Sequence, residues 1–289
     1  MEGKEKRILS VVAILLGLIL AILLYLKFTE SDEHKFKIIY FNVGQGDSAL
    51  IKFTNGQRML VDCGPDKKVL SKLGKYLPFF DRRLDYLLVT HPDSDHYAGC
   101  PAVLQRYDVK NIFLNGAQKP GDPFWEAWKK YRALEGANEK IINGQQNLQV
   151  GDSEVTFLSP DDSLKMSDVA PGDTNNYSIV FLLKNSLGRF LFTGDMETSL
   201  ENALLQKYCS QATTPCSELK ADYLKVGHHG SNSSSGVNFI KVVAPKYSIV
   251  SVGPPPNRYG HPSLRVLRKL EREGSIIWRT DQLDDIIVP

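Results

Sequence analysis

The fold of this chain is decided by residues 86–99, which read Tyr86-Leu-Leu-Val-Thr-His-Pro-Asp-Ser-Asp-His-Tyr-Ala-Gly99. An apolar run typical of a buried strand leads directly into four side chains of metal-binding type, namely His91, Asp93, Asp95 and His96. The side chains at 91 and 93 alternate like strand neighbours and are predicted to face one ion. Those at 95 and 96 lie where a helix would begin and could serve another. The stretch therefore predicts a site for two divalent ions, whereas the alternative is a polar loop whose aspartates cap a helix.

The N-terminal region predicts a membrane anchor. Residues 10–26 contain no charged side chain, which is about the length needed to cross a bilayer. Lys4, Lys6 and Arg7 precede this run and no small-residue cleavage site follows it, which favours an uncleaved anchor over a secretory signal peptide. We therefore predict a cytoplasmic tail and transmembrane anchor at residues 1–28, a linker at 29–37 and one extracytoplasmic domain at 38–289.

Charge and cysteine content place few limits on function. The net charge of +2 and the pI near 8.2 are mild and do not by themselves indicate nucleic acid binding. Cys209 and Cys216 bracket a short polar loop and could pair in an oxidising space, and Cys63 and Cys100 lie beside the predicted site. All four could equally be small buried or free thiols.

The predicted strands repeat between the two halves of the chain. Residues 37–43, 48–53 and 58–64 predict three strands ending near Asp62, followed by a helix at 68–77 and a strand at 84–90. Strands at 177–183 and 189–195, the latter ending on Asp195, and a helix at 199–208 repeat this order. Asp222-Tyr-Leu-Lys-Val-Gly-His228 then matches Asp85-Tyr-Leu-Leu-Val-Thr-His91 at five of seven positions.

This repeat predicts how the site forms. Each half delivers an aspartate at one strand end and a histidine at the next. Because strands that end at the same edge of a sheet bring their tips together, two halves packed face to face would gather these residues in one cleft. The pattern predicts two mixed sheets between helical layers, whereas the alternative is a chance likeness between apolar strands.

The remaining segments give weaker signals. A strand at 110–114, a helix at 123–134 and short strands at 145–150 and 154–158 are predicted in the middle of the chain. Trp125 and Trp128 could stack on a base, although core packing is favoured. Residues 163–176 are predicted to form a loop at the cleft, and strands at 247–252, 275–279 and 286–288 with a helix at 263–273 complete the chain.

Several motifs in combination resemble a known family. His91-Pro-Asp-Ser-Asp-His96, Thr193-Gly-Asp195 and Lys225-Val-Gly-His-His-Gly-Ser231 resemble the metallo-β-lactamase-fold hydrolases. Phe41-Asn-Val-Gly-Gln-Gly-Asp-Ser48 and Asn257-Arg-Tyr-Gly-His-Pro262 narrow the resemblance to the extracellular, ComEC/Rec2-like hydrolase domain of competence proteins. The resemblance covers residues 38–289 and implies an α/β fold, an αββα sandwich with a two-metal site between its sheets.

The resemblance also implies a ligand set. By position, the ligands would be His91 and Asp93 for one ion, Asp95, His96 and His228 for the other, and Asp195 between them. Asp62 looks like the family's supporting aspartate, which orients the ligand loop. The family usually has His where Asp93 stands and another His before the strand at 177, where this chain offers Asn175 and Asn176. Such an oxygen-rich site suits manganese better than an all-imidazole one, and zinc and manganese both stay open.

These residues predict phosphodiester hydrolysis. Bound ions would lower the pKa of a shared water and neutralise charge on the oxygens being displaced. Asp95 belongs to this predicted catalytic group, and His229 and His261 are candidates to donate a proton to the leaving oxygen or to contact a phosphate oxygen. Ser231 and Arg258 could donate to the same phosphate. The alternatives are that His229 only supports a carboxylate and that Arg258 is a surface charge.

We therefore predict a membrane-anchored phosphodiesterase or nuclease that cuts DNA outside the cell, beside a separate channel protein. Another phosphodiester, such as a wall polymer or a phospholipid head group, is an alternative substrate. A β-lactam or thioester hydrolase is disfavoured because those relatives usually keep the imidazoles missing here. A metal-stabilised binding module without turnover would be favoured if His229 and His261 pointed away from the metals.

Overall fold

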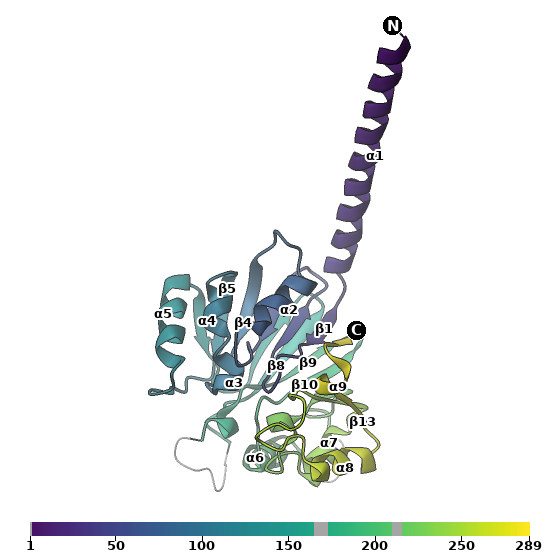
Figure 1. Ribbon diagram of the computed structural model, residues 1–289. Coiled ribbons are helices and arrows are strands. Elements are labelled where there is room, and N and C mark those ends of the chain that lie inside the picture. The colour runs from purple at the N-terminus through teal and green to yellow at the C-terminus, as the bar shows by residue number, and fades with distance from the viewer. Residues whose placement is uncertain (1, 165–172, 210–215) are drawn as a thin grey trace.

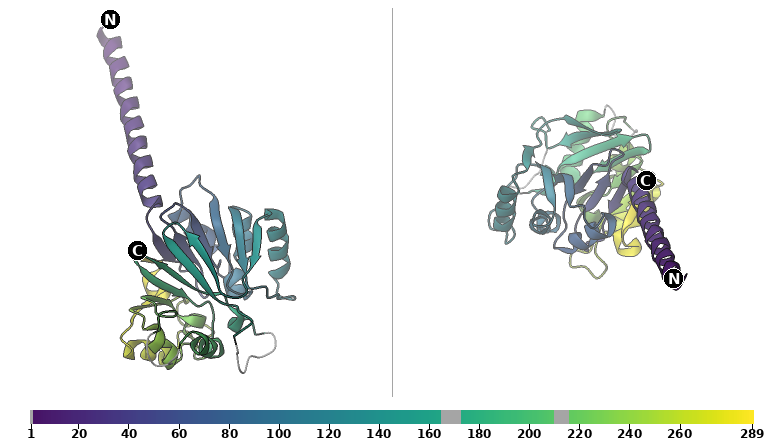
Figure 2. Two further views of the ribbon diagram at one scale, coloured as in Figure 1. Left: turned by 180° about the vertical axis from the view of Figure 1, so that it is seen from behind. Right: turned by 90° about the horizontal axis from the view of Figure 1, so that it is seen from above.

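The computed structural model describes residues 2–164, 173–209 and 216–289, without the side chains of residues 2, 6, 8 and 21–33. The predicted loops at 163–176 and between Cys209 and Cys216 therefore lie largely outside the described residues. A long helix, α1 (Glu2–Glu33), projects from a two-sheet domain (Figure 1). The C-terminus lies near the point where α1 enters the domain (Figure 2), because β14 pairs with β1.

α1 extends beyond the predicted anchor and takes in the start of the predicted linker, since β1 begins only at Lys37. No helix in the described part of the chain is both long and apolar enough to span a membrane. The predicted span at residues 10–26 is therefore not supported, and its side chains from residue 21 onward are not described.

Fourteen described strands form two sheets of seven. The first sheet has the order β14 (Ile286–Val288), β1 (Lys37–Tyr40), β2 (Ala49–Lys52), β3 (Arg58–Val61), β4 (Arg83–Leu88), β5 (Asp108–Leu114), β6 (Asn138–Ile141). The second has the order β13 (Ile276–Arg279), β12 (Tyr247–Val250), β11 (Tyr223–Lys225), β10 (Gly188–Phe192), β9 (Val180–Asn185), β8 (Ser153–Ser159), β7 (Gln146–Val150).

Helices cover the outer faces of both sheets. The helices on the first sheet are α2 (Lys68–Tyr76), α3 (Ser94–Tyr97), α4 (Cys100–Leu104) and α5 (Trp125–Glu135). Those on the second are α6 (Thr198–Tyr208), α7 (Val237–Val243) and α8 (Leu264–Arg272), and α9 (Thr280–Leu283) links β13 to β14. Short 3₁₀ turns are η1 (Asn175–Tyr177) and η2 (Gly227–Gly230).

Strand alternation builds three apolar layers. Ile38 and Tyr40 of β1 enter the layer between the sheets, together with Phe181 and Phe192 of the second sheet. The intervening Ile39 packs outward against the helices of the first sheet. A corresponding layer lies between the second sheet and its helices. The period-two apolar pattern of the strands therefore produces the αββα sandwich.

The internal repeat is present in the hydrogen bonding. Strands β1 to β5 and β8 to β12 pair in the same way, with two antiparallel steps followed by two parallel ones. The Asp85 carboxylate accepts the Arg58 backbone N–H at 3.0 Å, and the Asp222 carboxylate accepts the Arg189 N–H at 2.9 Å. The matching aspartates thus join equivalent strands in each half.

Three features differ from the sequence prediction or settle its alternatives. β6 was not predicted because its Asn-Glu-Lys-Ile residues are all exposed and carry no apolar alternation. α7 was also missed, since its β-branched residues resemble a strand. Trp125 and Trp128 are 5% and 1% exposed in the layer around α5, which selects core packing over base stacking.

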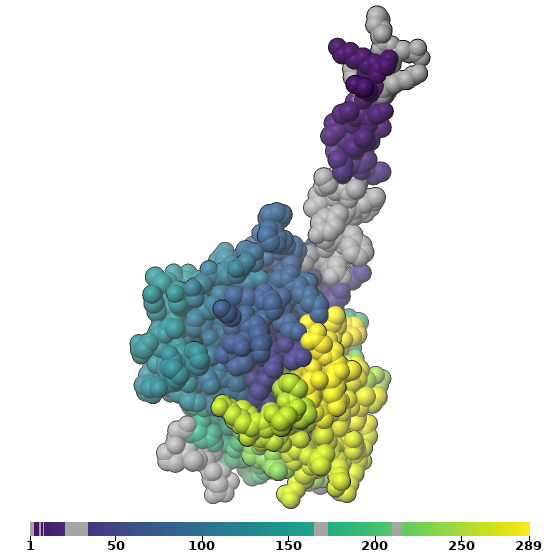
Figure 3. Space-filling view, in the orientation of Figure 1, coloured from purple at the N-terminus to yellow at the C-terminus, as the bar shows by residue number. Residues whose placement is uncertain are grey.

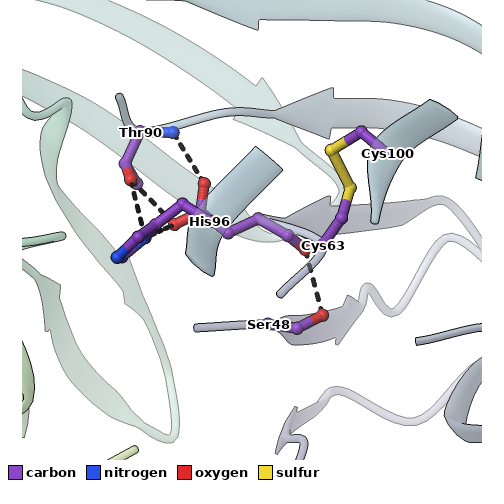
Figure 4. Close-up of a disulfide and its surroundings, with 6 residues drawn as sticks. Ser48, Cys63, Thr90, His96 and Cys100 are labelled. Carbon is purple, nitrogen blue, oxygen red and sulfur yellow. Dashed lines mark hydrogen bonds and ion pairs between the residues drawn. A yellow bond between two sulfur atoms is a disulfide. The ribbon is translucent and has the colours of Figure 1, made fainter. Parts of the chain in front are cut away.

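Both cysteine pairs form disulfides. Cys209 bonds to Cys216, one of the two possibilities left open by the sequence, and Cys63 bonds to Cys100. The Cys63–Cys100 bond ties the end of β3 to α4, to one side of Thr90 and His96 (Figure 4).

Candidate metal centre

The site begins where β4 ends and α3 starts. Asp62, after β3, adopts a left-handed conformation with φ of 56°, and its N–H bonds to the carbonyl of Leu88 at 2.8 Å. Its carboxylate accepts the Thr90 N–H at 2.8 Å, the Thr90 hydroxyl at 2.7 Å and Nδ1 of His96 at 2.9 Å. This buried carboxylate therefore fixes the start of the ligand loop, where Thr90 and His96 lie side by side (Figure 4), and leaves Nε2 of His96 facing Asp195.

Four side chains converge on one point. Ligand atoms of Asp95, His96, Asp195 and His229 all lie within 4.8 Å of one another. Asp195 Oδ1 is 3.2 Å from His96 Nε2, and its Oδ2 is 3.4 Å from His229 Nε2. The same His229 nitrogen is 3.1 Å from Asp95 Oδ2. Residues from both halves of the repeat therefore meet at the edge between the sheets, as the strand order predicted.

His91 borders this group on the Asp195 side. Its ring centroid is 4.1 Å from that of His96, and its Nε2 lies 4.0 Å from Asp195 Oδ2. Nδ1 of His91 contacts the hydroxyls of Thr90 at 3.0 Å and Ser178 at 3.3 Å. These contacts hold the ring so that Nε2 faces Asp195.

Buried atoms without partners test whether these residues fit a cation. His91 Nε2, His96 Nε2 and Asp195 Oδ1 are buried and make no hydrogen bond among the described residues, although the last two atoms lie 3.2 Å apart as an ion pair. Leaving such groups unsatisfied costs about 1–3 kcal/mol each, so native proteins rarely do so. Imidazole and carboxylate donors aimed at one space are the ligands that divalent ions bind, and the residues present therefore fit metal.

The electrostatics of the cluster also suit a cation. Burial raises the pKa of Asp195, but His229 and His96 hold it well below its ordinary value. Burial lowers the pKa of His96, yet Asp195 and Asp62 raise it well above the usual range. The anionic oxygens of the cluster thus favour positive charge in the space between them.

The structure places His229, rather than the adjacent His228, among the clustered ligand atoms. His228 and His229 both adopt left-handed backbone conformations, with φ of 45° and 51°. This backbone turn carries the 1% exposed His229 into the cluster with Asp95 and His96, where His228 had been predicted. His228 is instead part-exposed, with Nδ1 at 2.9 Å from Glu197 Oε1 and Nε2 at 3.9 Å from Asp195 Oδ2.

Asp93 is not among the clustered ligand atoms in the described residues. Its Oδ1 forms an ion pair with Lys119 and accepts the Thr174 hydroxyl. Burial raises the pKa of Asp93, but His91 and then Lys119 lower it overall. The Asp93 carboxylate therefore lies close enough to His91 for a Coulombic interaction, although its hydrogen bonds go to Lys119 and Thr174.

Asn175 and Asn176, which were expected near the substrate, both lie beside Glu197. Asn176 is buried, and its Oδ1 accepts the N–H groups of Glu197 and Leu200 at the start of α6, which is a structural contact. Asn175 lies 3.4 Å from Glu197 Oε1.

Ser231, His261 and Arg258 lie outside the group of clustered ligand atoms in the described residues. The Ser231 hydroxyl is 2.9 Å from that of Ser233. The His261 ring lies 5.4 Å from that of His228, and burial followed by the charge of His228 lowers the pKa of His261 to about 4. His261 is therefore neutral near pH 7 in the absence of metal. Arg258 is exposed on the loop before His261.

Sequence reasoning missed three residues of the site. Asp47 Oδ2 pairs with Lys225 at 2.7 Å, and its Oδ1 is 3.3 Å from His229 Nδ1. Burial raises the pKa of Asp47, but Lys225 and His229 lower it to about 2. Glu197 holds His228. The signals were present, since Asp47 and Lys225 both stand in the motifs that carried the family resemblance.

Comparison with known proteins agrees with this geometry. The profile of the Metallo-beta-lactamase superfamily matches residues 41–253. ComE operon protein 3 of Bacillus subtilis is 29% identical over 96% of this chain and 36% of its own length. Competence protein ComA of Neisseria gonorrhoeae is 30% identical over 86% of this chain and 31% of its own length. The chain thus spans about a third of the length of these relatives.

A solved structure shows the same fold. Zn²⁺-bound PqqB from Methylobacterium extorquens superposes with a TM-score of 0.53 at 11% identity, covering 88% of this chain and 99% of its own. At this identity the likeness establishes the fold alone. From the profile match over most of the folded domain, the two mixed sheets and the competence-protein relatives, the chain belongs to the metallo-β-lactamase superfamily, as a ComEC/Rec2-like domain.

Proposed function

We propose that this chain is a metal-dependent phosphodiesterase that cleaves DNA outside the cell. The observation that carries the proposal is the convergence of Asp95, His96, Asp195 and His229 on one space, where His96 Nε2 and Asp195 Oδ1 are buried without a hydrogen bond among the described residues. Such a site suits a substrate whose reaction develops negative charge on oxygen.

The ligands proposed for two divalent ions are Asp95, His96, His229 and Asp195 around one ion, and His91 with Asp195 and Asp93 around the other. When bound, such ions supply Lewis acidity and make a water nucleophilic near neutral pH. Zinc and manganese both remain candidates. Three carboxylates among the proposed ligands favour a hard, oxygen-preferring ion more than a site made of imidazoles would.

The side chains around this cluster would orient the substrate and move protons. His228 reaches the mouth of the site, and its Nδ1 bond to Glu197 fixes the ring with Nε2 toward Asp195. We assign to it the donation of a hydrogen bond or proton to the leaving oxygen. His229 is enclosed by Asp47, Asp95 and Asp195, which leaves it better placed to bind metal than to reach a leaving group.

The proposed substrate follows from three supporting facts. The curated relatives named above carry competence names, which are consistent with DNA. Two disulfides are typical of proteins outside the cytosol. α3, which follows His91 directly, lies at the end of the strands away from α1 (Figure 1). If α1 marks the membrane side, the site faces away from the bilayer, which favours a soluble polymer over a phospholipid head group.

We also retain the proposal that residues 10–26 hold the domain at a membrane, with the N-terminus in the cytoplasm and a separate channel protein as partner. Described large apolar residues between Leu9 and Leu20 are 46–68% exposed around α1. Protease digestion of intact and of permeabilised cells tests this topology. Protection of the domain in intact cells would refute it.

The activity is tested with the full-length chain in detergent, stripped with a chelator and reloaded with Mn²⁺ or Zn²⁺. Single-stranded DNA, double-stranded DNA and bis(p-nitrophenyl) phosphate are offered as substrates. We expect metal-dependent cleavage that Asp195→Ala abolishes. Metal binding without cleavage of any phosphodiester would refute the enzyme and favour a binding module.

A further inference from the structure

A groove opens beside the metal centre and reaches Asp95. It has a volume of about 280 Å³ and is lined by four segments of the chain, which include Gln45, Lys68, Asp95 and Arg258. The loop at 254–260, yellow-green in Figure 3, lies on this face beside the N-terminal half of the domain. A groove near the lower end of the size range for small-molecule sites suits one nucleotide rather than a base pair.

The outer wall of the groove is held by short-range contacts. The Asn257 carboxamide oxygen accepts the N–H groups of Tyr259 at 3.2 Å and His261 at 3.1 Å. The loop also packs against the first half of the domain, because a Cβ at Gly253 would lie only 2.9 Å from the Gln45 nitrogen. Tyr259 is therefore presented on a wall whose backbone is already ordered.

Aromatic rings lead from this wall to the metal centre. Tyr259 is 48% exposed as a residue, and its ring is nearly parallel to that of His261, with centroids 6.1 Å apart and planes at 15°. His261 in turn contacts the His228 ring. A base that stacks on Tyr259 would thus place its nucleotide next to the residues proposed for the reaction.

Cationic groups flank the same ring. The Arg258 guanidinium lies over the Tyr259 ring, 4.7 Å from its centroid. Lys68 lines the same groove, where its side chain is 60% exposed and pairs with Asp66 at 3.8 Å. Two flexible cations and an exposed aromatic ring in one groove match the alternation of phosphate and base along a single strand.

We propose that this groove binds one nucleotide of a single-stranded nucleic acid next to the cleaved phosphodiester, with its base on Tyr259 and its phosphate between Arg258 and Lys68. This inference rests on the proposed function for the class of substrate, but it concerns binding and is tested without turnover.

A base would bind the Tyr259 ring more strongly than the Arg258 guanidinium does. An exposed cation–π contact shifts an equilibrium by about two- to fivefold. Stacking of a base on an aromatic side chain corresponds to about 5-fold to about 150-fold. A base can therefore replace the Arg258 guanidinium on the ring, which frees that cation to pair with a phosphate.

The test compares two fluorescein-labelled probes of equal charge, a short oligothymidylate and its abasic counterpart. Binding to the full-length chain is followed by anisotropy with chelator present, so that no cleavage occurs. We expect the wild-type protein to prefer the thymidylate by at least about fivefold. Tyr259→Ala should remove this preference and leave the abasic affinity unchanged, whereas Tyr259→Phe should retain it.

Two further variants separate the contributions. Lys68→Ala should weaken both probes equally, because it removes charge and not a stacking surface. Phe80→Ala serves as the control, since Phe80 is 92% exposed on the loop between α2 and β4, outside the groove, and should change neither affinity. Equal binding of the two probes by the wild type, no binding of either, or an unchanged preference in Tyr259→Ala would each overturn the inference. Loss of nuclease activity alone would not.

Discussion

Replacement of Asp62 by Asn tests how the second layer of the site controls metal binding. Asn has nearly the same shape and tolerates the left-handed backbone found at this position. The substitution exchanges one of two accepting oxygens for an NH₂ group. Those oxygens accept the Thr90 N–H at 2.8 Å and His96 Nδ1 at 2.9 Å, so either orientation of the amide loses a contact.

Each orientation has a defined consequence. If the NH₂ faces Thr90, two donors oppose each other in a buried site. If it faces His96, that ring must accept at Nδ1 and carry its proton on Nε2, the atom that faces Asp195 and would bind metal. We therefore expect metal affinity to fall by about 10–100-fold, or about 1.4–2.8 kcal/mol.

Calorimetric titration of Mn²⁺ or Zn²⁺ into the metal-free chain measures this loss. Asp85→Asn is the matched control, because Asp85 is also buried and accepts a backbone N–H, from Arg58, at the other end of β4. It should lower the free energy of unfolding without a change in metal affinity. Wild-type affinity in Asp62→Asn, or an equal loss in both variants, would refute the assignment.

Three further predictions concern stability, measured by urea unfolding. Gly99→Ala should destabilise the protein by more than about 3 kcal/mol, because its Cβ would lie 2.2 Å from the Cys63 carbonyl oxygen. Gly74→Ala on α2 is the control. Its Cβ would meet nothing within 4 Å, so the variant should be neutral or stabilising by up to about 1 kcal/mol. Similar effects of the two would contradict the packing. Reduction of the Cys63–Cys100 bond, which closes a separation of 37 residues, should lower the free energy of unfolding by about 4 kcal/mol. The measurement uses the Cys209→Ser/Cys216→Ser variant with and without reductant, so that only this bond changes. An unchanged unfolding midpoint would exclude a stabilising bond. Burial raises the pKa of Glu201 to about 7, although the N–H groups of Gly236 and Ser235 oppose the shift. The stabilisation from the protonated Glu201 carboxyl is therefore complete below the unfolded-state pKa near 4.5 and is lost as pH rises through 7, which lowers the free energy of unfolding by about 3 kcal/mol. Glu201→Gln should flatten the stability profile between these values, and parallel profiles would show that another group titrates there.

Much of the fold followed from local sequence patterns. Alternating apolar residues predicted the strands that fill the layer between the sheets, and the likeness of Asp85–His91 to Asp222–His228 predicted the repeat seen in the strand pairing. Elements without such a pattern, β6 and α7, were missed because exposure or β-branching hid their type. Periodicity reports burial, and these segments lacked the expected signal.

The sequence by itself determined that histidines and aspartates would gather at the strand ends of two repeated halves. The reason is that His91, Asp195 and their neighbours stand at fixed positions after the predicted strands of each half. Only the tertiary structure decided which of two adjacent histidines enters the cluster, since the left-handed turn at 228 and 229 depends on packing from both halves. The tertiary structure also decided that Asp93 pairs with Lys119 and that the buried Asp47 pairs with Lys225. Ligand type follows from residue identity, but direction in space follows from backbone geometry and from partners remote in the chain.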